Sequence, residues 1–506
     1  MNNSTYKNIL LLVLISIGAK VLGFGRELMI ANKFGASSDA DAFFVALTLS
    51  SLIGALIGQS LNTVMIPLLT EIRNKNNIND KNRFTSNLLG IIILFSILLF
   101  VISYLLSPVI VNIVAYGFDI NQYNLTLKLF RVGLLSVLLT GVMSILRAYL
   151  QSEKKFNESA FSEMAINISY LFFLFFYADN YGVYGLMLAG VLGVLIQVFI
   201  QFIALRSTKF SYNFLFDIRD LYIKKVIVLS APIFLTVIVN DINKSVDKAL
   251  ASSLIEGSVS ALSYGNRINV MIFGIFITSI ATIIFTDLSD LAANKSFVKF
   301  KKTFLSSASL IILLTIPLTL MLIVFSNQIV SILFERGLFN SKATEMTSSS
   351  LVYYSIGLTG LSLRLLLVKT FFSLQLTKVP MINSIIAVVF NIILSVILVK
   401  TMKHDGLALA SSLSITFISI IMFFSLRRKI GYINYKYLGI IVFKTIIAAL
   451  TMTLLSKYVY NILYINNTMI ISLLISLTIG LVVYIIICSL LKVKELNLII
   501  LKIKNK

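Results

Sequence analysis

Apolar stretches long enough to cross a lipid bilayer recur along the chain, and they constrain its fold more than any other feature. In lipid, backbone polar groups must pair within the spanning segment, so each stretch of about 18–25 residues is expected to be a helix. Mean hydropathy is +0.95, and only 13% of the residues are charged. The sequence therefore predicts an all-α polytopic membrane protein. It has about fourteen transmembrane helices, at 8–32, 40–70, 85–114, 124–150, 158–179, 183–205, 224–250, 258–288, 304–334, 346–375, 380–400, 406–426, 437–461 and 467–491.

The net charge of +22 would suit nucleic-acid binding, but the distribution of the basic residues indicates a membrane orientation instead. With the N-terminus placed in the cytoplasm, most lysines and arginines fall in the inward loops and in the C-terminal tail. This asymmetry is the positive-inside bias, and an even number of spans then places both termini in the cytoplasm. The first span contains Lys20 and no small-residue cleavage site, so we expect a retained helix rather than a signal peptide.

Residue types that usually carry catalysis or bind metals are scarce in this chain. Cys488 is the one cysteine and is predicted to be a packing residue, and His404 is the one histidine and lies in a short polar loop. The sequence contains no nucleotide-binding motif, no cysteine–histidine metal spacing and no catalytic set. We therefore expect a protein that is not an enzyme and has no cofactor. Any transport would depend on the membrane potential, an ion gradient or a substrate gradient.

The sequence repeats itself at a spacing of about 221 residues. Residues 185–189 match residues 406–410 at this offset, and 150–154 match 374–378 at an offset of about 224, as Asn167 matches Asn391. An offset of six helices preserves orientation, which indicates two parallel six-helix repeats that form two lobes around a central cavity. The predicted parts are a first lobe at 1–210, a second lobe at 211–432, and two further helices with a basic cytoplasmic tail at 433–506.

The first span carries charged residues inside its apolar run, namely Lys20, Arg26 and Glu27. A charge at that depth costs about 3 kcal/mol or more unless it faces protein, water or a ligand. A helix bend at Gly23 or Gly25 would bring the two cations to one cavity. We predict cations that face a cavity and bind an anion. The alternative is that one of them pairs with Glu27 or extends to the membrane interface.

Polar residues also mark the second and seventh spans. Ser38 and Asp41 have the spacing of a capping box, although Asp41 could instead pair with Arg26. In the seventh span, Asp241, Lys244 and Lys248 share one helix face and can pair with one another. Asp247 lies off that face and is a candidate cation ligand together with Asn391, with pairing inside the helix bundle as the alternative.

Arginines and lysines of later spans add further candidates. Arg267 in the eighth span is predicted to bind an anion, because a guanidinium group can hold two phosphate oxygens at once. Arg364 and Lys369 lie in the tenth span, and Arg131 and Arg147 lie near the ends of the fourth. Each of these four residues either extends the cavity or lies at an interface.

These residues resemble the MurJ/MviN flippases of the multidrug/oligosaccharidyl-lipid/polysaccharide exporter superfamily. The likeness is carried by Lys20–Glu27, Asp39–Ala46, Asp247–Leu254, Glu256–Arg267, Leu333–Phe339 and Lys369–Pro380. The resemblance implies two six-helix lobes plus two helices. It also implies a flippase that moves a polyprenyl-diphosphate-linked cell-wall precursor, lipid II, to the outer leaflet of the bacterial cytoplasmic membrane by alternating access.

By position, Lys20 stands where the family usually has a cavity arginine, and Arg26, Asp41 and Arg267 match its cavity residues directly. We predict that Lys20, Arg26 and Arg267 hold the diphosphate, and that Asp41 orients Arg26 or releases it when the transporter changes state. The resemblance also implies that a groove of the last two helices receives the lipid tail. Some members bind sodium at positions resembling Asp247 and Asn391, but Ser395 stands where their second acid is expected.

One segment departs from the family pattern. Residues 51–67 contain neither the arginine nor the glutamate that peptidoglycan flippases usually carry there. A flippase for capsule, O-antigen or teichoic-type repeat units on the same carrier is therefore the alternative function. A drug/cation antiporter would need an acidic cavity and is less favoured. The expected partners are the lipid-linked oligosaccharide and membrane lipids, with no nucleic acid, and we expect a monomer.

Overall fold

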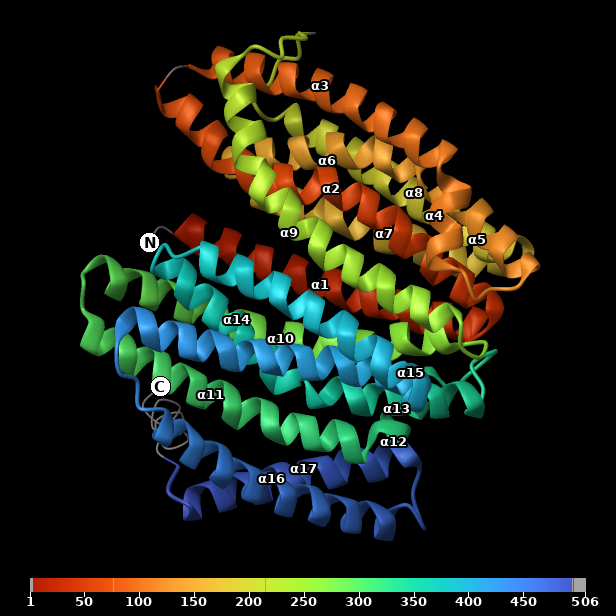
Figure 1. The fold of residues 1–506 in the computed structure, drawn as a ribbon, viewed down its shortest axis with the longest axis vertical. Coiled ribbons are helices and arrows are strands. Elements are labelled where there is room, and N and C mark those ends of the chain that lie inside the picture. The colour runs from red at the N-terminus through yellow and green to blue at the C-terminus, as the bar shows by residue number, and fades with distance from the viewer. Residues whose placement is uncertain (1–2, 76, 214, 494, 496–506) are drawn as a thin grey trace. The chain divides into compact units, whose positions relative to one another are not determined.

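The computed structural model describes residues 3–75, 77–213, 215–493 and 495, and this part of the chain is helical without strands (Figure 1). It divides into two compact units. The first comprises residues 1–260 with 336–339, and the second comprises 261–335 with 340–506. The first unit contains α1 (Asn3–Phe34), α2 (Ser38–Lys75), α3 (Ile78–Leu105), α4 (Ser107–Val114), α5 (Ile120–Gly133), α6 (Leu135–Ser152), α7 (Phe156–Phe176), α8 (Ala178–Leu205) and α9 (Leu221–Ser252).

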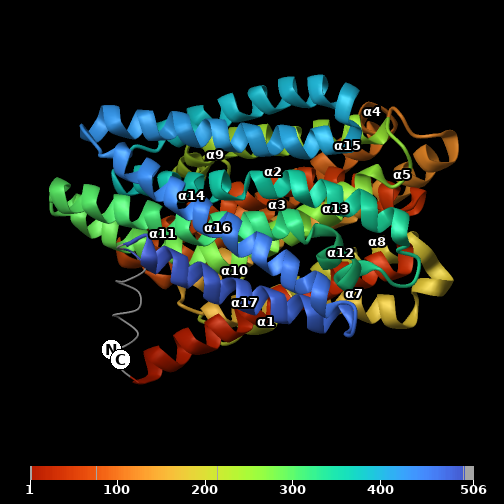
Figure 2. The ribbon, with the colours of Figure 1, turned by 90° about the horizontal axis from the view of Figure 1, so that it is seen from below.

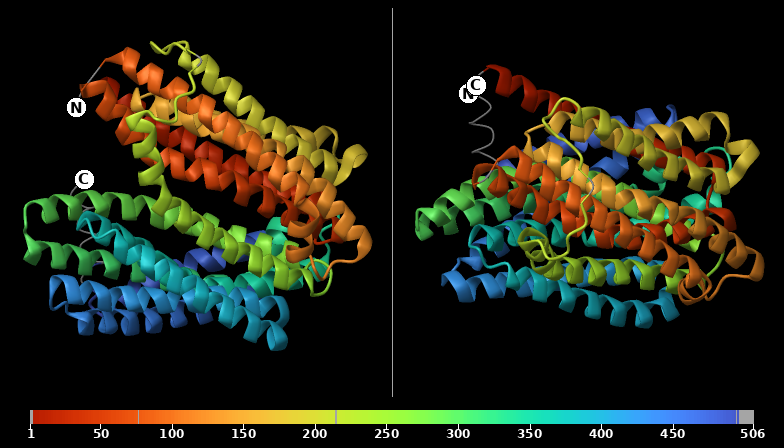
Figure 3. Two further views of the ribbon diagram at one scale, coloured as in Figure 1. Left: turned by 45° about the horizontal axis from the view of Figure 1, so that its top comes forward. Right: turned by 90° about the horizontal axis from the view of Figure 1, so that it is seen from above.

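The second unit begins within α10 (Ser258–Ala293), whose first three residues belong to the first unit. Its other helices are α11 (Phe297–Val324), α12 (Ser326–Phe334), α13 (Ser341–Ile356), α14 (Leu358–Ser373), α15 (Lys378–Ile430), α16 (Tyr435–Leu463) and α17 (Met469–Leu490). Figure 2 shows α16 and α17 side by side at the C-terminal end of this unit, and Figure 3 shows the helices of the first unit in red to yellow-green.

All fourteen predicted spans coincide with a helix or a helix pair. Among the described residues, eleven helices are long and apolar enough to cross a membrane. The number is twelve if α13 and α14, bent by 44°, form one span. The prediction of fourteen also counts α1, and it counts α15 twice. That helix is 53 residues long because two helical segments merge across the break at Lys403.

Breaks at equivalent positions confirm the internal repeat. Gly182 (φ 54°, ψ −150°) interrupts α8, and Lys403 (φ 53°, ψ −133°) interrupts α15 at the spacing found in the sequence. The turns that follow α6 and α14 contain left-handed residues at the same spacing, Lys154 and Gln375. Each half of the chain therefore bends at the same places, as two parallel copies of one helical unit would.

The second sequence offset is wrong. The amide of Lys155 donates to Leu150 O at 2.8 Å, and the amide of Leu376 donates to Phe371 O at 2.9 Å, so the two turns correspond at an offset of 221. The match of 150–154 with 374–378 rests on similar residue types, but it is displaced by about one helical turn from the structurally equivalent residues. Asn167 and Asn391 are consequently not equivalent positions.

The division of the chain after Ser260 differs from the predicted lobe boundary at 210. Helix α9 packs with the first unit, where Lys225 forms an ion pair with Glu71 of α2 at 2.7 Å. The ring of Tyr222 also meets the ring of Phe84 on α3 edge to face. These contacts at its N-terminal end place α9 beside α2. The three predicted parts, which were based on the repeat, stay a prediction.

The core of the second unit joins the last two helices to the rest of that unit. Phe300, Phe304 and Phe371 are fully buried in a cluster that also contains Cys488. The hydroxyl group of Tyr484 on α17 donates to Leu313 O on α11 at 2.7 Å. The prediction that Cys488 is a packing residue is confirmed, and α16 and α17 are anchored to this unit by both apolar and polar contacts.

The paired helix breaks give a stability prediction. Gly182→Ala should destabilise the protein by about 1–2 kcal/mol, because a side chain at positive φ strains the backbone, and no atom lies near enough to its Cβ to add a clash. Lys403→Gly should raise stability, because glycine relieves the same strain at the equivalent break. The midpoint of thermal unfolding in detergent measures both, with Gly439→Ala inside α16 as a control. A lower midpoint for Lys403→Gly would contradict the strain argument.

Candidate functional site

Arg26 on α1 is held by Glu27 and by two residues of α7. Its Nη2 donates to Glu27 Oε1 at 2.6 Å, and its Nη1 donates to Asn167 Oδ1 at 3.2 Å. The guanidinium carbon lies 5.0 Å from the centre of the Tyr170 ring, a cation–π distance. The Nε atom is buried and has no hydrogen-bond partner among the described residues. The pairing with Glu27 is therefore present, and one donor of Arg26 remains for a ligand.

Lys20 is exposed on the same helix, whereas Glu27 is buried. Helix α1 runs from Asn3 to Phe34 without the predicted interruption at Gly23 or Gly25. Six residues of an α-helix turn through about 600°, so Lys20 and Arg26 leave α1 on different sides. The structure does not provide the bend that would bring these two cations to one cavity.

Asp41 caps the start of α10 rather than pairing with Arg26. Its Oδ2 accepts from the amide of Gly257 at 2.8 Å, and its Oδ1 accepts from the amide of Ser260 at 2.7 Å. The carboxylate is 2% exposed. Free amides at a helix N-terminus carry partial positive charge, which stabilises a buried carboxylate there. Both carboxylate oxygens of Asp41 are thus used by these amides, so the alternative pairing with Arg26 is not present in this structure.

The contact between α2 and the loop before α10 is reciprocal. The amide of Ser38 donates to Glu256 Oε1 at 2.8 Å, so each segment caps the other. Gly257 has φ +86°, and a Cβ there would lie 2.7 Å from Ala36 O. The capping residue of α2 is Ser37, whose Oγ accepts from the amide of Ala40. The predicted capping box of Ser38 and Asp41 is thus wrong, since both residues take part in the exchange between segments.

The polar residues of α9 are partly paired, as the sequence allows. Asp241 is buried, and its Oδ1 lies 2.6 Å from Lys244 Nζ, which is exposed. Lys248 Nζ donates to Val259 O at 3.2 Å and lies 5.8 Å from the centre of the Phe44 ring. Asp247 is half-buried on the same helix. The predicted pair within α9 is confirmed for Asp241 and Lys244.

The candidates of the second unit have separate surroundings. Arg267 is exposed on α10. Arg364 Nη2 donates to Ser384 Oγ at 3.0 Å, and Lys369 Nζ lies 5.0 Å from the centre of the Phe285 ring. Asn391 is buried and donates to Ser411 Oγ at 3.3 Å.

The cation-site prediction joins Asp247 of the first unit with Asn391 of the second, so neither unit by itself tests it. Within the part of the chain that the structure describes, no group of three or more histidine, cysteine, aspartate or glutamate residues could hold a metal ion.

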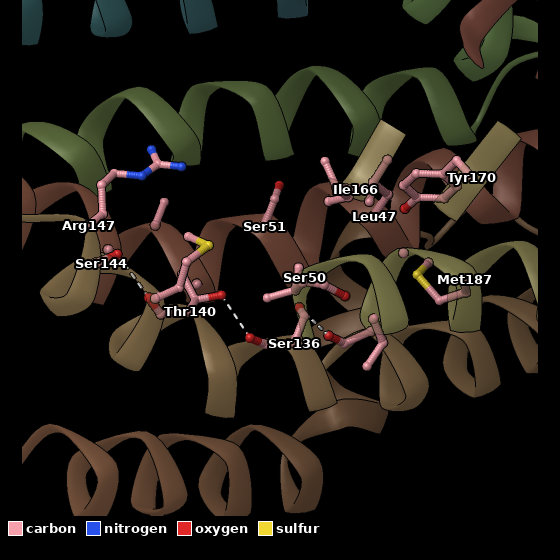
Figure 4. Close-up of a pocket in the computed structure, with 18 of the residues that line it drawn as sticks. Leu47, Ser50, Ser51, Ser136, Thr140, Ser144, Arg147, Ile166, Tyr170 and Met187 are labelled. Carbon is pink, nitrogen blue, oxygen red and sulfur yellow. Dashed lines mark hydrogen bonds between the residues drawn. The ribbon is translucent and has the colours of Figure 1, made fainter. Parts of the chain in front are cut away.

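A cavity of about 330 Å³ lies inside the first unit, among α2, α6, α7 and α8 (Figure 4). Segment 51–67, which departs from the family pattern, supplies Ser51, Gly54, Ala55, Gly58 and Asn62 to its wall. Opposite walls come from α6 and from Tyr170, the residue that also supports Arg26. The unusual segment therefore leaves open space where longer side chains would fill the cavity.

Sequence reasoning missed the two residues of α7 that hold Arg26. In the sequence, Asn167 stands out only as a match between the repeats, and no pattern marks Tyr170. An asparagine three residues before a tyrosine places both on one helix face, a usable but weak signal. The partner of that face could not be deduced, because the contact between α1 and α7 joins residues about 140 positions apart.

The repeated breaks and the apolar helices define a class of protein, a polytopic helical transporter built from two parallel repeats. A family profile described as "Lipid II flippase MurJ" matches residues 30–494. The chain belongs to this MurJ family.

Curated relatives and solved structures agree with this assignment. A "Probable lipid II flippase MurJ" of Buchnera aphidicola subsp. Baizongia pistaciae is 30% identical over 84% of this chain and 83% of its own length. One of Thermotoga maritima is 25% identical over 98% of each chain. A structure entitled "Lipid II flippase MurJ, inward closed conformation" has a TM-score of 0.80 at 24% identity, covering 95% of this chain and 98% of its own.

An inward-facing multidrug resistance MATE family transporter of the MOP superfamily has a TM-score of 0.69 at 14% identity, over 83% of this chain and 98% of its own. At this identity the likeness shows the fold alone.

The Asp41 cap gives a prediction for local dynamics. Asp41→Ala should expose the amides of Gly257 and Ser260 to exchange, because the substitution removes their acceptors at a cost of about 1–2 kcal/mol. Hydrogen–deuterium exchange with mass spectrometry of the purified protein would follow the peptide that contains both amides. Asp39→Ala, on an exposed residue of the same turn, is the matched control. Equal protection in the two variants would show that Asp41 does not cap α10.

Proposed function

We propose that this protein is a flippase that moves lipid II, a polyprenyl-diphosphate-linked precursor of peptidoglycan, from the inner to the outer leaflet of the bacterial cytoplasmic membrane. Membership of the MurJ family is the observation that carries this proposal. The family match also favours lipid II over the capsule or O-antigen repeat units that segment 51–67 left open. The activity is translocation rather than a chemical reaction, so the chain needs binding groups and two accessible states.

Arg26 is the residue of the first unit best suited to hold the diphosphate. Its guanidinium group is oriented by Asn167 and Tyr170 and keeps a buried Nε donor. Glu27 partly neutralises the charge of Arg26, so the guanidinium group attracts an anion less strongly than an unpaired arginine would. Such a site can bind a diphosphate and also release it, and a transporter needs both. Arg267 and Lys20, both exposed, are the further cations proposed to contact the substrate, with Lys20 at a different point from Arg26 because the two leave α1 on different sides.

Asp41 has a different role in this proposal from the one that the resemblance implies. It caps α10 and so fixes the segment that joins α9 to α10. Alternating access would require this segment to change position, which makes Asp41 a positioning residue.

The energy source is proposed to be the membrane potential or an ion gradient, because the chain has no nucleotide-binding motif. The positive-inside bias supports cytoplasmic termini.

The last two helices offer a place for the lipid tail. A cavity of about 540 Å³ on α16 is lined mainly by Gly439, Ile440, Phe443 and Ile447, with Lys436 and Lys444 beside them. Apolar side chains suit a polyprenyl chain, and the lysines suit phosphate groups near the membrane surface. This arrangement supports a tail that stays in contact with α16 while the headgroup crosses.

The function is tested in a strain depleted of its own peptidoglycan flippase. The wild-type chain should restore growth and lipid II translocation. Arg26→Ala and Arg267→Ala should each reduce translocation at least tenfold, because removing a charge-assisted hydrogen bond to phosphate costs about 1.5–3 kcal/mol. Arg428→Ala, on an exposed arginine at the end of α15, is the control. Normal translocation by both Arg26→Ala and Arg267→Ala, at equal expression, would exclude these residues as diphosphate ligands.

A further inference from the structure

The cavity of the first unit has a mainly apolar wall that also carries a row of polar groups. Its polar lining residues are Ser50, Ser51, Asn62, Ser136, Thr140, Ser144, Arg147 and Tyr170. Polar groups inside such a bundle cost free energy unless they have partners or face water or a ligand. A volume of about 330 Å³ lies at the lower end of the range for small-molecule sites. The cavity therefore has the size and the chemistry of a binding site.

The hydroxyl groups of this wall can accept hydrogen bonds but have little left to donate. The serine and threonine hydroxyl groups each donate a proton to a backbone carbonyl oxygen three or four residues earlier, at 2.7–2.9 Å, as found for Ser50, Ser51, Ser136, Thr140 and Ser144. The free lone pairs of these oxygens accept from O–H or N–H groups. A ligand with several such donors can bind this row of oxygens, while its apolar parts face the leucine, isoleucine, valine and methionine side chains of the wall.

Two buried polar atoms of the wall lack a hydrogen-bond partner among the described residues, Arg147 Nε and Asn62 Oδ1. Arg147 Nη1 lies 2.9 Å from Glu163 Oε1, so one edge of the guanidinium group is held by a carboxylate that is itself 48% exposed. The Nε edge is left as a donor. Buried polar atoms in folded proteins are nearly always partnered, so these two atoms are available to hydrogen-bond a polar ligand or water.

One end of the cavity is cationic and the other is aromatic. Figure 4 shows Arg147 at one end and Tyr170 at the other, with the hydroxyl groups of Ser51, Ser136 and Thr140 between them. Tyr170 packs against Arg26, the proposed diphosphate ligand. A molecule with a diphosphate next to a hydroxyl-rich group would therefore place the first at Arg26 and the second inside the cavity.

We propose that this cavity is a subsite for the glycan headgroup of the lipid-linked precursor. The row of hydroxyl oxygens accepts from sugar O–H and amide N–H groups, and Arg147 binds an anionic group attached to the sugar. The inference rests on the proposed function and adds the part of the substrate that the first unit recognises. Gly54 and Gly58 keep the cavity open, since a Cβ at Gly58 would lie only 3.0 Å from Ser144 Oγ.

Binding of two probes to the purified full chain tests the proposal. The probes are lipid II and a polyprenyl diphosphate that lacks the glycan, each titrated in detergent and measured by native mass spectrometry. Arg147→Gln and Gly54→Leu should weaken binding of lipid II about tenfold and leave binding of the bare diphosphate unchanged. Glu163→Gln should bind lipid II at least as tightly as wild type, because the neutral amide no longer offsets the charge of Arg147.

Arg131→Gln is the matched control. Arg131 belongs to the same unit, and its Nε already donates to Ser107 Oγ at 2.9 Å. It is not among the residues that line the cavity. This variant should bind both probes as wild type does. Arg147→Gln changes one side chain at the cavity wall without adding bulk, so it tests the subsite even if Gly54→Leu does not fold.

Each other outcome has a definite meaning. Equal weakening of both probes by Arg147→Gln would show that the cavity holds the diphosphate, which overturns the glycan subsite. Wild-type affinity of Arg147→Gln for lipid II would overturn it as well, while the proposed function stands. Failure of the wild-type chain to bind lipid II would overturn the proposed function and the subsite together, and it differs from the other outcomes because no variant is needed to see it.

Discussion

Charges that enter the apolar helices must find partners, and the structure of the first unit depends on how they do so. Lys81, fully buried in α3, pairs with Glu153 and lies 4.3 Å from the centre of the Tyr149 ring. Arg26 is partnered by Glu27 and by Asn167 of α7. Asp41 accepts from the amide of Gly257, before α10, and from that of Ser260, within it. An unpartnered charge in such surroundings would cost several kcal/mol, so each pairing fixes one helix against another.

The repeat explains why helices break where they do. Two copies of one unit bend after equivalent helices, and the break of α8 at a glycine recurs in α15 at Lys403, a residue that tolerates the same backbone less well. A short helix follows the third long helix of the first copy as α4 and recurs as α12. The two repeats thus share a backbone plan while their side chains differ. Arg147 and the hydroxyl-lined cavity belong to the first unit, and the apolar cluster around Phe304 belongs to the second.

Much of the architecture follows from local sequence. Helix positions could be predicted because apolar runs of spanning length leave the backbone no alternative to a helix. The partners of Asp41 could not be predicted, because a carboxylate near the start of a helix has the same local sequence pattern whether it caps its own helix or another one. The same holds for Arg26, because the sequence allows either Glu27 or Asp41 as its partner. Lys81 lies before the predicted span at 85–114 but is a buried residue of α3, and its partner Glu153, in a distant turn, has no local signal in the sequence.

The sequence by itself determined that this is a membrane protein of many helices, that the helices form two copies of one unit, and that cations lie inside the apolar layer. These properties are set by hydropathy, by period and by residue type, which act locally. Tertiary structure alone decided which groups meet: that Asn167 and Tyr170 orient Arg26, that Asp41 caps α10, and that segment 51–67 opens a cavity towards Arg147. Such contacts join distant parts of the chain, and their geometry depends on how whole helices pack.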